Sequence, residues 1–152
     1  MSSARAVLFL CTGNYFRSRF AELLFNRLAG EAALPVRAVS AGLEQECHTR
    51  NPGPISPHTL AGLRARGVPV AEPRIPRDVT DQDLAGADLI IAVKESEHRP
   101  MVAERFPAWA DRVRYWNVDD IDLAAPPDAL ARLESLVRAL VVELGDTTAQ
   151  WR

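Results

Sequence analysis

A cysteine and an arginine with five residues between them form the part of this sequence best suited to chemistry. Arg17 can grip two oxygens of a phosphate-like anion in a fork, and a positive field around Cys11 would favour its nucleophilic thiolate. Gly13 and Asn14 are the residue types that most readily take left-handed backbone angles, which turn successive amides inward. Ser18 can donate its hydroxyl to the thiolate. The segment therefore predicts an anion-binding loop with a cysteine nucleophile.

This loop is expected to join a strand to a helix. Residues 7–10 form an apolar run rich in strand formers, and Leu23, Leu24 and Leu28 recur at helical spacing. Ligands of α/β sheets bind at the carboxyl ends of strands, where a helix amino terminus adds free N–H groups and a partial positive charge. Cys11 alone would indicate an inert buried residue. Together with Gly13, Arg17 and Ser18 between a strand and a helix, it favours a catalytic role.

Further segments predict more strands and helices. The uninterrupted apolar run at 89–93 is typical of a strand buried on both faces, as in a parallel sheet. Ser56-Pro57 is a helix start, and Gly30 suits the end of the first helix. The predicted strands are residues 7–10, 36–39, 89–93 and 113–116, the later helices include 56–67 and 130–144, and 146–152 are predicted to be a tail.

The segment that begins at Cys11 resembles the signature of the low-molecular-weight protein tyrosine phosphatases, approximately Cys-x-Gly-Asn-x-x-Arg-Ser-Pro-x-Ala-Glu. The matching residues are Cys11, Gly13, Asn14, Arg17, Ser18, Ala21 and Glu22. The resemblance continues at lower specificity through residues 40–42, 56–67, 81–92 and 106–107. It implies one flavodoxin-like, three-layer α/β domain over residues 1–152, with a central four-stranded parallel sheet and helices on both faces.

The resemblance also implies an activity. Phosphate monoesters, phosphotyrosine on proteins first among them, would be hydrolysed through a phosphocysteine on Cys11, with inorganic phosphate as product. Arg17 and the loop amides would stabilise the equatorial oxygens. In the family a serine holds the loop asparagine, a role that transfers to Ser40 and Asn14. The implied phosphate loop comprises Thr12, Gly13, Asn14, Tyr15, Phe16 and Ser18. No metal or cofactor is expected, because the loop and its arginine supply the positive field.

The cleavage of a phosphate ester also needs a proton donor. Three acids, Asp119, Asp120 and Asp122, lie directly after the fourth predicted strand. In the family the general acid belongs to an Asp-Pro-aromatic motif, and the resemblance places Asp120 at that position, with Asp119 where the family has proline. Asp119 is the second choice and Asp122 the third.

Several positions depart from the family pattern. Arg19 stands where the family usually has proline, and Lys94-Glu95 where it typically has Met-Asp. Tyr15 and Phe16 replace an aliphatic residue and a second cysteine, which makes the site bulkier.

The irregular segment 43–55 is expected to form one wall of the cleft, since the family's equivalent loop does so. His48 is the residue of this segment expected to touch substrate, together with Tyr15 and Asp119 as further cleft candidates. An exposed histidine without a role is the competing interpretation. Cys47, in the same segment, could resolve an oxidised Cys11.

Composition limits the other classes of function. The 152 residues contain 18 basic and 20 acidic side chains in interspersed order, for a net charge of −2, which argues against a nucleic-acid-binding surface. The apolar run near the amino terminus is too short for a signal peptide or a membrane span. Two cysteines make no disulfide framework, and a reactive thiolate suits a reducing compartment. A cytoplasmic enzyme acting on phosphorylated proteins or small monoesters is therefore expected.

Two other functions stay open. An arsenate reductase on this fold would use Cys11 on arsenate and pass the oxidation to further cysteines, for which only Cys47 is available. The second open function is that of a non-catalytic phosphate-binding module, which is suggested by Tyr15, Arg19 and the altered aspartate motif. Phosphoarginine ranks below phosphotyrosine as a substrate, because relatives that take it carry a small residue at the position of Tyr15.

Overall fold

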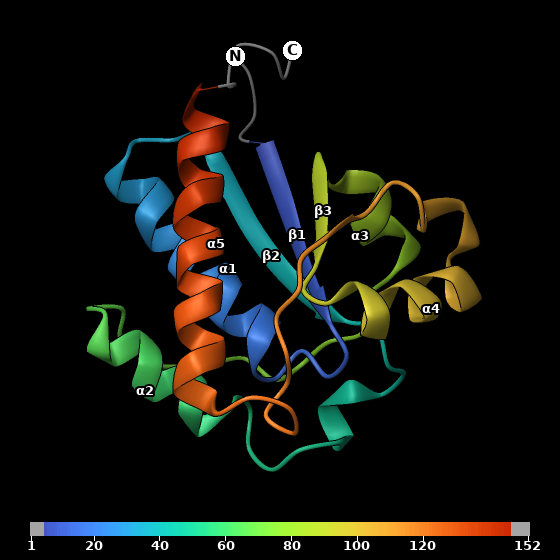
Figure 1. The fold of residues 1–152 in the computed structure, drawn as a ribbon, viewed down its shortest axis with the longest axis horizontal. Coiled ribbons are helices and arrows are strands. Elements are labelled where there is room, and N and C mark those ends of the chain that lie inside the picture. The colour runs from blue at the N-terminus through green and yellow to red at the C-terminus, as the bar shows by residue number, and fades with distance from the viewer. Residues whose placement is uncertain (1–4, 147–152) are drawn as a thin grey trace.

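Four parallel strands form the central sheet. The computed structural model describes residues 5–146. In spatial order the strands are β2 (Val36–Gly42), β1 (Arg5–Cys11), β3 (Leu89–Ala92) and β4 (Arg114–Tyr115). Because β1 has a neighbour on each side, its carboxyl end lies at the centre of one edge of the sheet (Figure 1). The predicted four-stranded parallel sheet is confirmed.

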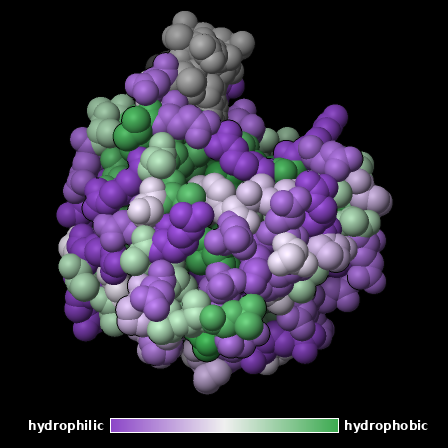
Figure 2. Space-filling model, in the orientation of Figure 1, coloured by the Kyte–Doolittle hydropathy of each residue, from purple (hydrophilic) through white to green (hydrophobic). Residues whose placement is uncertain are grey.

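Helices cover both faces of this sheet, as Figure 1 shows. One face packs against α1 (Arg17–Glu31), α2 (Pro57–Ala65) and α5 (Pro126–Asp146). The other packs against α3 (Asp81–Gly86) and α4 (Glu95–Arg105). Two short 3₁₀ segments, Cys47–Thr49 and Pro107–Trp109, lie in the connections. Within residues 5–146 no helix is long and apolar enough to cross a membrane. Hydrophilic residues cover much of the face in Figure 2.

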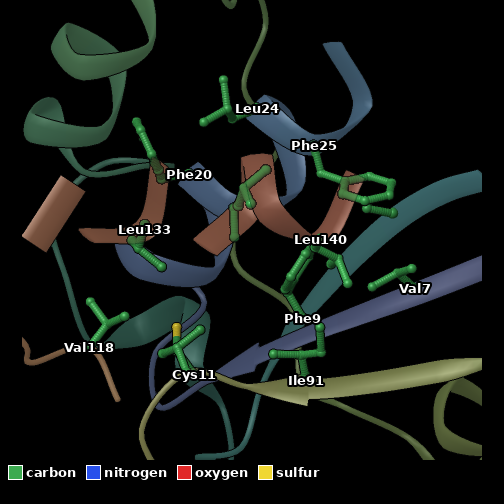
Figure 3. Packing of buried hydrophobic residues seen from close by; sticks show 14 of the residues in the cluster. Val7, Phe9, Cys11, Phe20, Leu24, Phe25, Ile91, Val118, Leu133 and Leu140 are labelled. Atoms are coloured by element: carbon green, nitrogen blue, oxygen red, sulfur yellow. The ribbon is translucent and has the colours of Figure 1, made fainter. Parts of the chain in front are cut away.

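The alternation of side chains along β1 decides which layer Cys11 faces. Val7 and Phe9 belong to the core beneath α1 and α5, whereas Leu8 and Leu10 belong to the core beneath α3 and α4. Cys11 continues the first series, so its side chain lies on the α1 side of the sheet, below the start of that helix (Figure 3).

Some element ends differ from the predictions. The first helix does not end at Gly30 but runs to Glu31, and Ala33 takes the left-handed angle after it, with φ 54°. The fourth strand is shorter than 113–116. Ser56 does cap α2, since its Oγ accepts from the N–H of His58. Asp146 is the last residue of α5, and the rest of the predicted tail lies outside the described residues.

Helices α2 and α5 approach each other at a glycine. A Cβ placed on Gly62 would lie 2.5 Å from Cδ1 of Leu130 and 3.4 Å from Cε1 of Phe20. Leu130 and Phe20 are buried in the core, so neither has open space to move into. The small residue at position 62 therefore permits this helix contact.

We expect Gly62→Ala to lower the free energy of unfolding by about 1–3 kcal/mol, because it overpacks this contact. Gly30→Ala is the matched control: the position is exposed in α1 with no atom near the added methyl, so alanine should raise stability by about 0.5–1 kcal/mol. Urea denaturation of both variants measures the difference. Equal effects of the two substitutions would contradict the packing argument.

Candidate active site

The loop after β1 gathers polar groups around the sulfur of Cys11. Its Sγ lies 2.9 Å from Oγ of Ser18. Asn14, which has the left-handed φ of 49°, donates from Nδ2 to Oγ of Ser18 and to Oγ of Ser40, both at 2.9 Å. Because an amide nitrogen can only donate, the hydroxyl hydrogen of Ser18 remains for the sulfur of Cys11. Ser18 therefore offers the sulfur of Cys11 a hydrogen-bond donor.

A second set of contacts holds Asn14 from behind. Its Oδ1 accepts from Nη1 of Arg74 at 2.9 Å and from the backbone N–H of Arg77 at 3.1 Å. Ser40 donates to Glu22 at 2.5 Å, and Arg74 bonds both Glu22 and Ser40. The amide of Asn14 is thus bonded at both ends, which fixes the strained backbone of the loop. The only signal of Arg74 in the sequence is a basic residue within a proline-rich stretch.

Arg19, which stands where the family has proline, is 2% exposed. Its guanidinium donates to three backbone carbonyls: Asn14 at 3.3 Å, Pro54 at 3.0 Å and Arg74 at 2.7 Å. Burial, together with the nearby charge of Arg74, lowers the pKa of Arg19 to about 10. Arg19 therefore ties the anion-binding loop to two other connections of the chain.

Arg17 lies with its guanidinium between two carboxylates and a carbonyl. Nη1 and Nη2 donate to the two oxygens of Glu97 at 3.1 and 2.7 Å, and Nη1 also donates to the carbonyl of Val118 at 3.0 Å. Oδ2 of Asp120 is 3.5 Å from Nη2. Within residues 5–146 no acceptor is bonded to Nε, so that N–H is free to donate to a ligand.

Glu97 links Arg17 to both the loop and α4. Besides Arg17, its Oε2 accepts from Oγ1 of Thr12 at 2.5 Å and lies 3.1 Å from Nε2 of His98. Burial alone would raise the pKa of Glu97, but the hydrogen bonds from His98, Arg17 and Thr12 outweigh it and hold that pKa well below its usual range. Glu97 is therefore a charged anchor for Arg17, and no sequence motif singles it out.

His98 is fully buried in the first turn of α4. Its Nδ1 accepts from the backbone N–H of Lys94 at 3.0 Å, which leaves the ring hydrogen on Nε2, facing Glu97. Burial lowers the pKa of His98. The neutral ring is consequently the form that fits these contacts.

The three candidate acids lie in different surroundings. Oδ1 of Asp120 accepts from the N–H of Ile121 at 2.9 Å, while Oδ2 faces Arg17. Asp119 instead forms an ion pair with Lys94, and Asp122 is exposed. Of the three, Asp120 is the one that lines the pocket above Cys11.

That pocket encloses about 260 Å³ at the carboxyl edge of the sheet. It is lined by Cys11, Thr12, Gly13, Tyr15, Phe16, Arg17, Glu44, Arg50, Asn51, Ser56, Asp120 and Ile121. Two of the cleft candidates are not among these lining residues: His48 lies exposed on its 3₁₀ turn, and Asp119 pairs with Lys94. Arg50 and Asn51, which follow His48 closely in the same segment, take its expected place. Tyr15 does line the pocket and donates its hydroxyl to the carbonyl of Pro52 at 2.6 Å.

Cys47 is buried and not bonded to Cys11, since both thiols are free. Burial raises the pKa of Cys47 to about 12, with help from the hydrogen bond to Asp78 and its charge. Its sulfur lies against Gly42, 2.8 Å from where a Cβ would stand. A thiol held neutral in this way is a poor nucleophile toward an oxidised Cys11. Within residues 5–146 no cluster of three or more histidine, cysteine or acidic side chains could hold a metal ion.

The fold and the site together define a class of protein. A cysteine at the end of β1, an arginine at the start of α1 and an acid that lines the same pocket are the parts of a cysteine-dependent phosphatase. The family model of the low molecular weight phosphotyrosine protein phosphatases matches residues 6–126. The chain belongs to this family, whose members act on phosphorylated proteins and release phosphate.

The relatives of this chain are named for different substrates. The chain is 36% identical to the low molecular weight protein-tyrosine-phosphatase YfkJ of Bacillus subtilis over 131 residues, 81% of this chain and 79% of that protein. It is 30% identical to the protein-arginine-phosphatase of the same organism over 107 residues, 70% and 67% of the two chains. An arsenate reductase of Brevibacillus brevis is 29% identical over 121 residues, 79% of each chain.

The solved structures agree on the fold. The crystal structure of YfkJ from Bacillus subtilis superposes with a TM-score of 0.80 at 23% identity, over 95% of this chain and 97% of that one. At this identity the likeness concerns the fold alone.

The hydrogen bonds of Glu97 predict that the orientation of the Arg17 guanidinium depends on this carboxylate. We expect Glu97→Gln to weaken competitive inhibition by inorganic phosphate about 10-fold or more. The amide has an acceptor at only one of the two positions that bond Nη1 and Nη2, so Arg17 loses its bidentate partner and turns away from the pocket. Glu95→Gln is the control, since Glu95 lies in the same turn but pairs with the exposed Arg99. An unchanged phosphate inhibition constant in Glu97→Gln would show that Arg17 keeps its orientation without this partner.

The buried His98 predicts an acid limit to stability. A histidine whose folded pKa lies below the ordinary value of 6.5 takes up a proton on unfolding, so stability falls as the pH drops below that value. Between about pH 7.5 and 5.5, the Tm of the wild type should fall more steeply than that of His98→Gln, which has no ring to protonate. Parallel Tm curves would contradict the assignment.

Proposed function

We propose that this chain hydrolyses phosphotyrosine in proteins by double displacement at Cys11. The thiolate attacks phosphorus, while Arg17 and the loop amides bind the equatorial oxygens. Asp120 gives its proton to the leaving phenolic oxygen and so becomes a carboxylate. That carboxylate then takes a proton from a water molecule, which attacks the phosphocysteine and releases inorganic phosphate with the thiolate restored.

One observation carries the proposal. Cys11, Arg17 and Asp120 line the same pocket, although they come from the loop after β1 and the segment after β4. Oδ2 of Asp120 is on the side of Arg17, where the bridging oxygen of a bound monoester would lie, and Oδ1 is engaged by the N–H of Ile121. This supports Asp120 rather than Asp119 or Asp122 as the acid.

The preference for phosphotyrosine rests on Tyr15. Its hydroxyl bond to Pro52 holds the ring as a fixed wall of the pocket, and Ile121, 55% exposed, lines the same pocket. A pocket lined by a tyrosine ring and an aliphatic side chain suits an aromatic ring. A phosphoarginine side chain, which is longer and flexible, gains less from such walls and ranks second.

The proposal extends to partners and compartment. Its substrates are phosphorylated proteins or small monoesters, and it involves no nucleic acid, membrane, metal or cofactor. The balanced surface charge and the two free thiols, Cys11 and Cys47, support a cytoplasmic enzyme that works as a single domain of residues 1–152.

The test is phosphate release from p-nitrophenyl phosphate in the presence of a chelator. Cys11→Ser should abolish turnover while phosphate binding remains measurable, and Asp120→Asn should lower kcat by about 10²–10⁴-fold. Turnover retained by Cys11→Ser would refute the nucleophile. A loss of this size in Asp119→Asn, but not in Asp120→Asn, would exchange the acid assignments.

Two further assays test which substrate is preferred and which class of function the protein has. A phosphotyrosine peptide should be hydrolysed with a higher kcat/KM than a phosphoarginine peptide, and Tyr15→Thr should reduce that ratio. If the wild type reduces arsenate and does not hydrolyse phosphate esters, the proposed phosphatase activity is wrong and the protein is an arsenate reductase, as the Brevibacillus relative is named. A folded protein that binds phosphate without either turnover would be a binding module.

A further inference from the structure

Lys94 carries a charge into the interior beside the proposed acid. Its side chain is 13% exposed, and Nζ forms an ion pair with Oδ1 of Asp119, whose side chain is 42% exposed. Among the residues that the structure describes, Asp119 is the acid paired with this ammonium. The pair lies between the carboxyl ends of β3 and β4, next to the catalytic pocket.

Backbone hydrogen bonds join the segment after β4 to the segment after β3 as far as Val118. The N–H of Val118 donates to the carbonyl of Val93 at 2.8 Å, and the N–H of Glu95 donates to the carbonyl of Trp116 at 3.1 Å. The side chains of the next two residues face different cations: Asp119 pairs with Lys94, and Asp120 lies opposite Arg17. Beyond them Ile121 is 55% exposed. Two successive carboxylates, Asp119 and Asp120, therefore lie next to two different cations.

We propose that Lys94 is a positioning residue for the proposed reaction, because its ion pair with Asp119 selects Asp120 as the carboxyl that enters the pocket. The inference rests on Asp120 as the acid of the proposed function. Two neighbouring aspartates and one arginine allow two arrangements of the loop, in which either acid faces Arg17. Lys94 removes the second arrangement, since turning Asp119 toward Arg17 would leave a mostly buried ammonium without its partner.

The charges around Arg17 make this selection necessary. Arg17 already holds both oxygens of Glu97 and faces Asp120. A further carboxylate at the guanidinium would compete with the phosphate oxygens for its remaining N–H groups. Holding Asp119 on Lys94 thus keeps the anion site open as well as orienting the acid.

Both members of the pair are positions where the sequence departs from the family pattern. Lys94 stands where the family typically has methionine, and Asp119 where it has proline. The structure places these two departures in contact, which indicates that they act as one unit.

The experiment measures kcat with two substrates that differ in their need for an acid. Phenyl phosphate has a poor leaving group and depends on protonation, whereas p-nitrophenyl phosphate depends on it less. In Lys94→Met we expect kcat for phenyl phosphate to fall about 10- to 100-fold, and clearly more than kcat for p-nitrophenyl phosphate. A general loss of structure would lower both rates alike and follow the Tm.

Further variants test the pair itself. Asp119→Asn should reproduce the selective loss, the double variant should be no worse than either single one, and Lys94→Asp combined with Asp119→Lys should recover part of it. Glu95→Gln, in the same turn, should leave both rates unchanged. Additive losses in the double variant, or equal losses on both substrates, would overturn the proposal.

Asp120→Asn separates this inference from the proposed function. If Asp120→Asn shows the selective loss on phenyl phosphate and Lys94→Met does not, Asp120 remains the acid and the role of Lys94 is refuted. If Asp120→Asn shows no selective loss on phenyl phosphate, Asp120 is not the acid, and the positioning role proposed for Lys94 is refuted as well.

Discussion

The bidentate ion pair between Arg17 and Glu97 is the interaction on which the rest of the site depends. It joins the loop after β1 to the first turn of α4, and Glu97 also accepts from Thr12 of the loop. Since Arg17 bonds the carbonyl of Val118 and faces Asp120, the pair sets the distance between the loop and the segment after β4. The parallel sheet allows this, because it brings the carboxyl ends of three strands to one edge.

Much of this arrangement could be predicted because its signals are local. Cys11, Asn14 and Arg17 lie within one short loop, and the flanking strand and helix have the hydrophobic periods that such elements require. The continuous apolar run at 89–93 predicted a strand covered on both faces, and β3 is one. The resemblance to a known family supplied the four-stranded parallel sheet and the long-range partner of Asn14, which no local pattern contains.

The remaining contacts could not be predicted, because each depends on side chains that meet only in the folded chain. Glu97 reads as an ordinary surface acid at a helix start until the sheet places it against Arg17. The order of preference between Asp119 and Asp120 has a physical reason only once Lys94 is seen beside Asp119. The place of His48 has a similar cause: the turn that contains it buries Cys47 and leaves the histidine exposed to solvent.

The three carbonyls bound by Arg19 constrain how this sequence can change. Replacement of Arg19 by the proline usual in the family would at once remove a donor from Asn14, Pro54 and Arg74, and the carbonyl of Asn14 is buried. These three hydrogen bonds couple position 19 to the two distant segments that carry Pro54 and Arg74. A graft of this loop onto another member of the family would therefore have to transfer both segments with it.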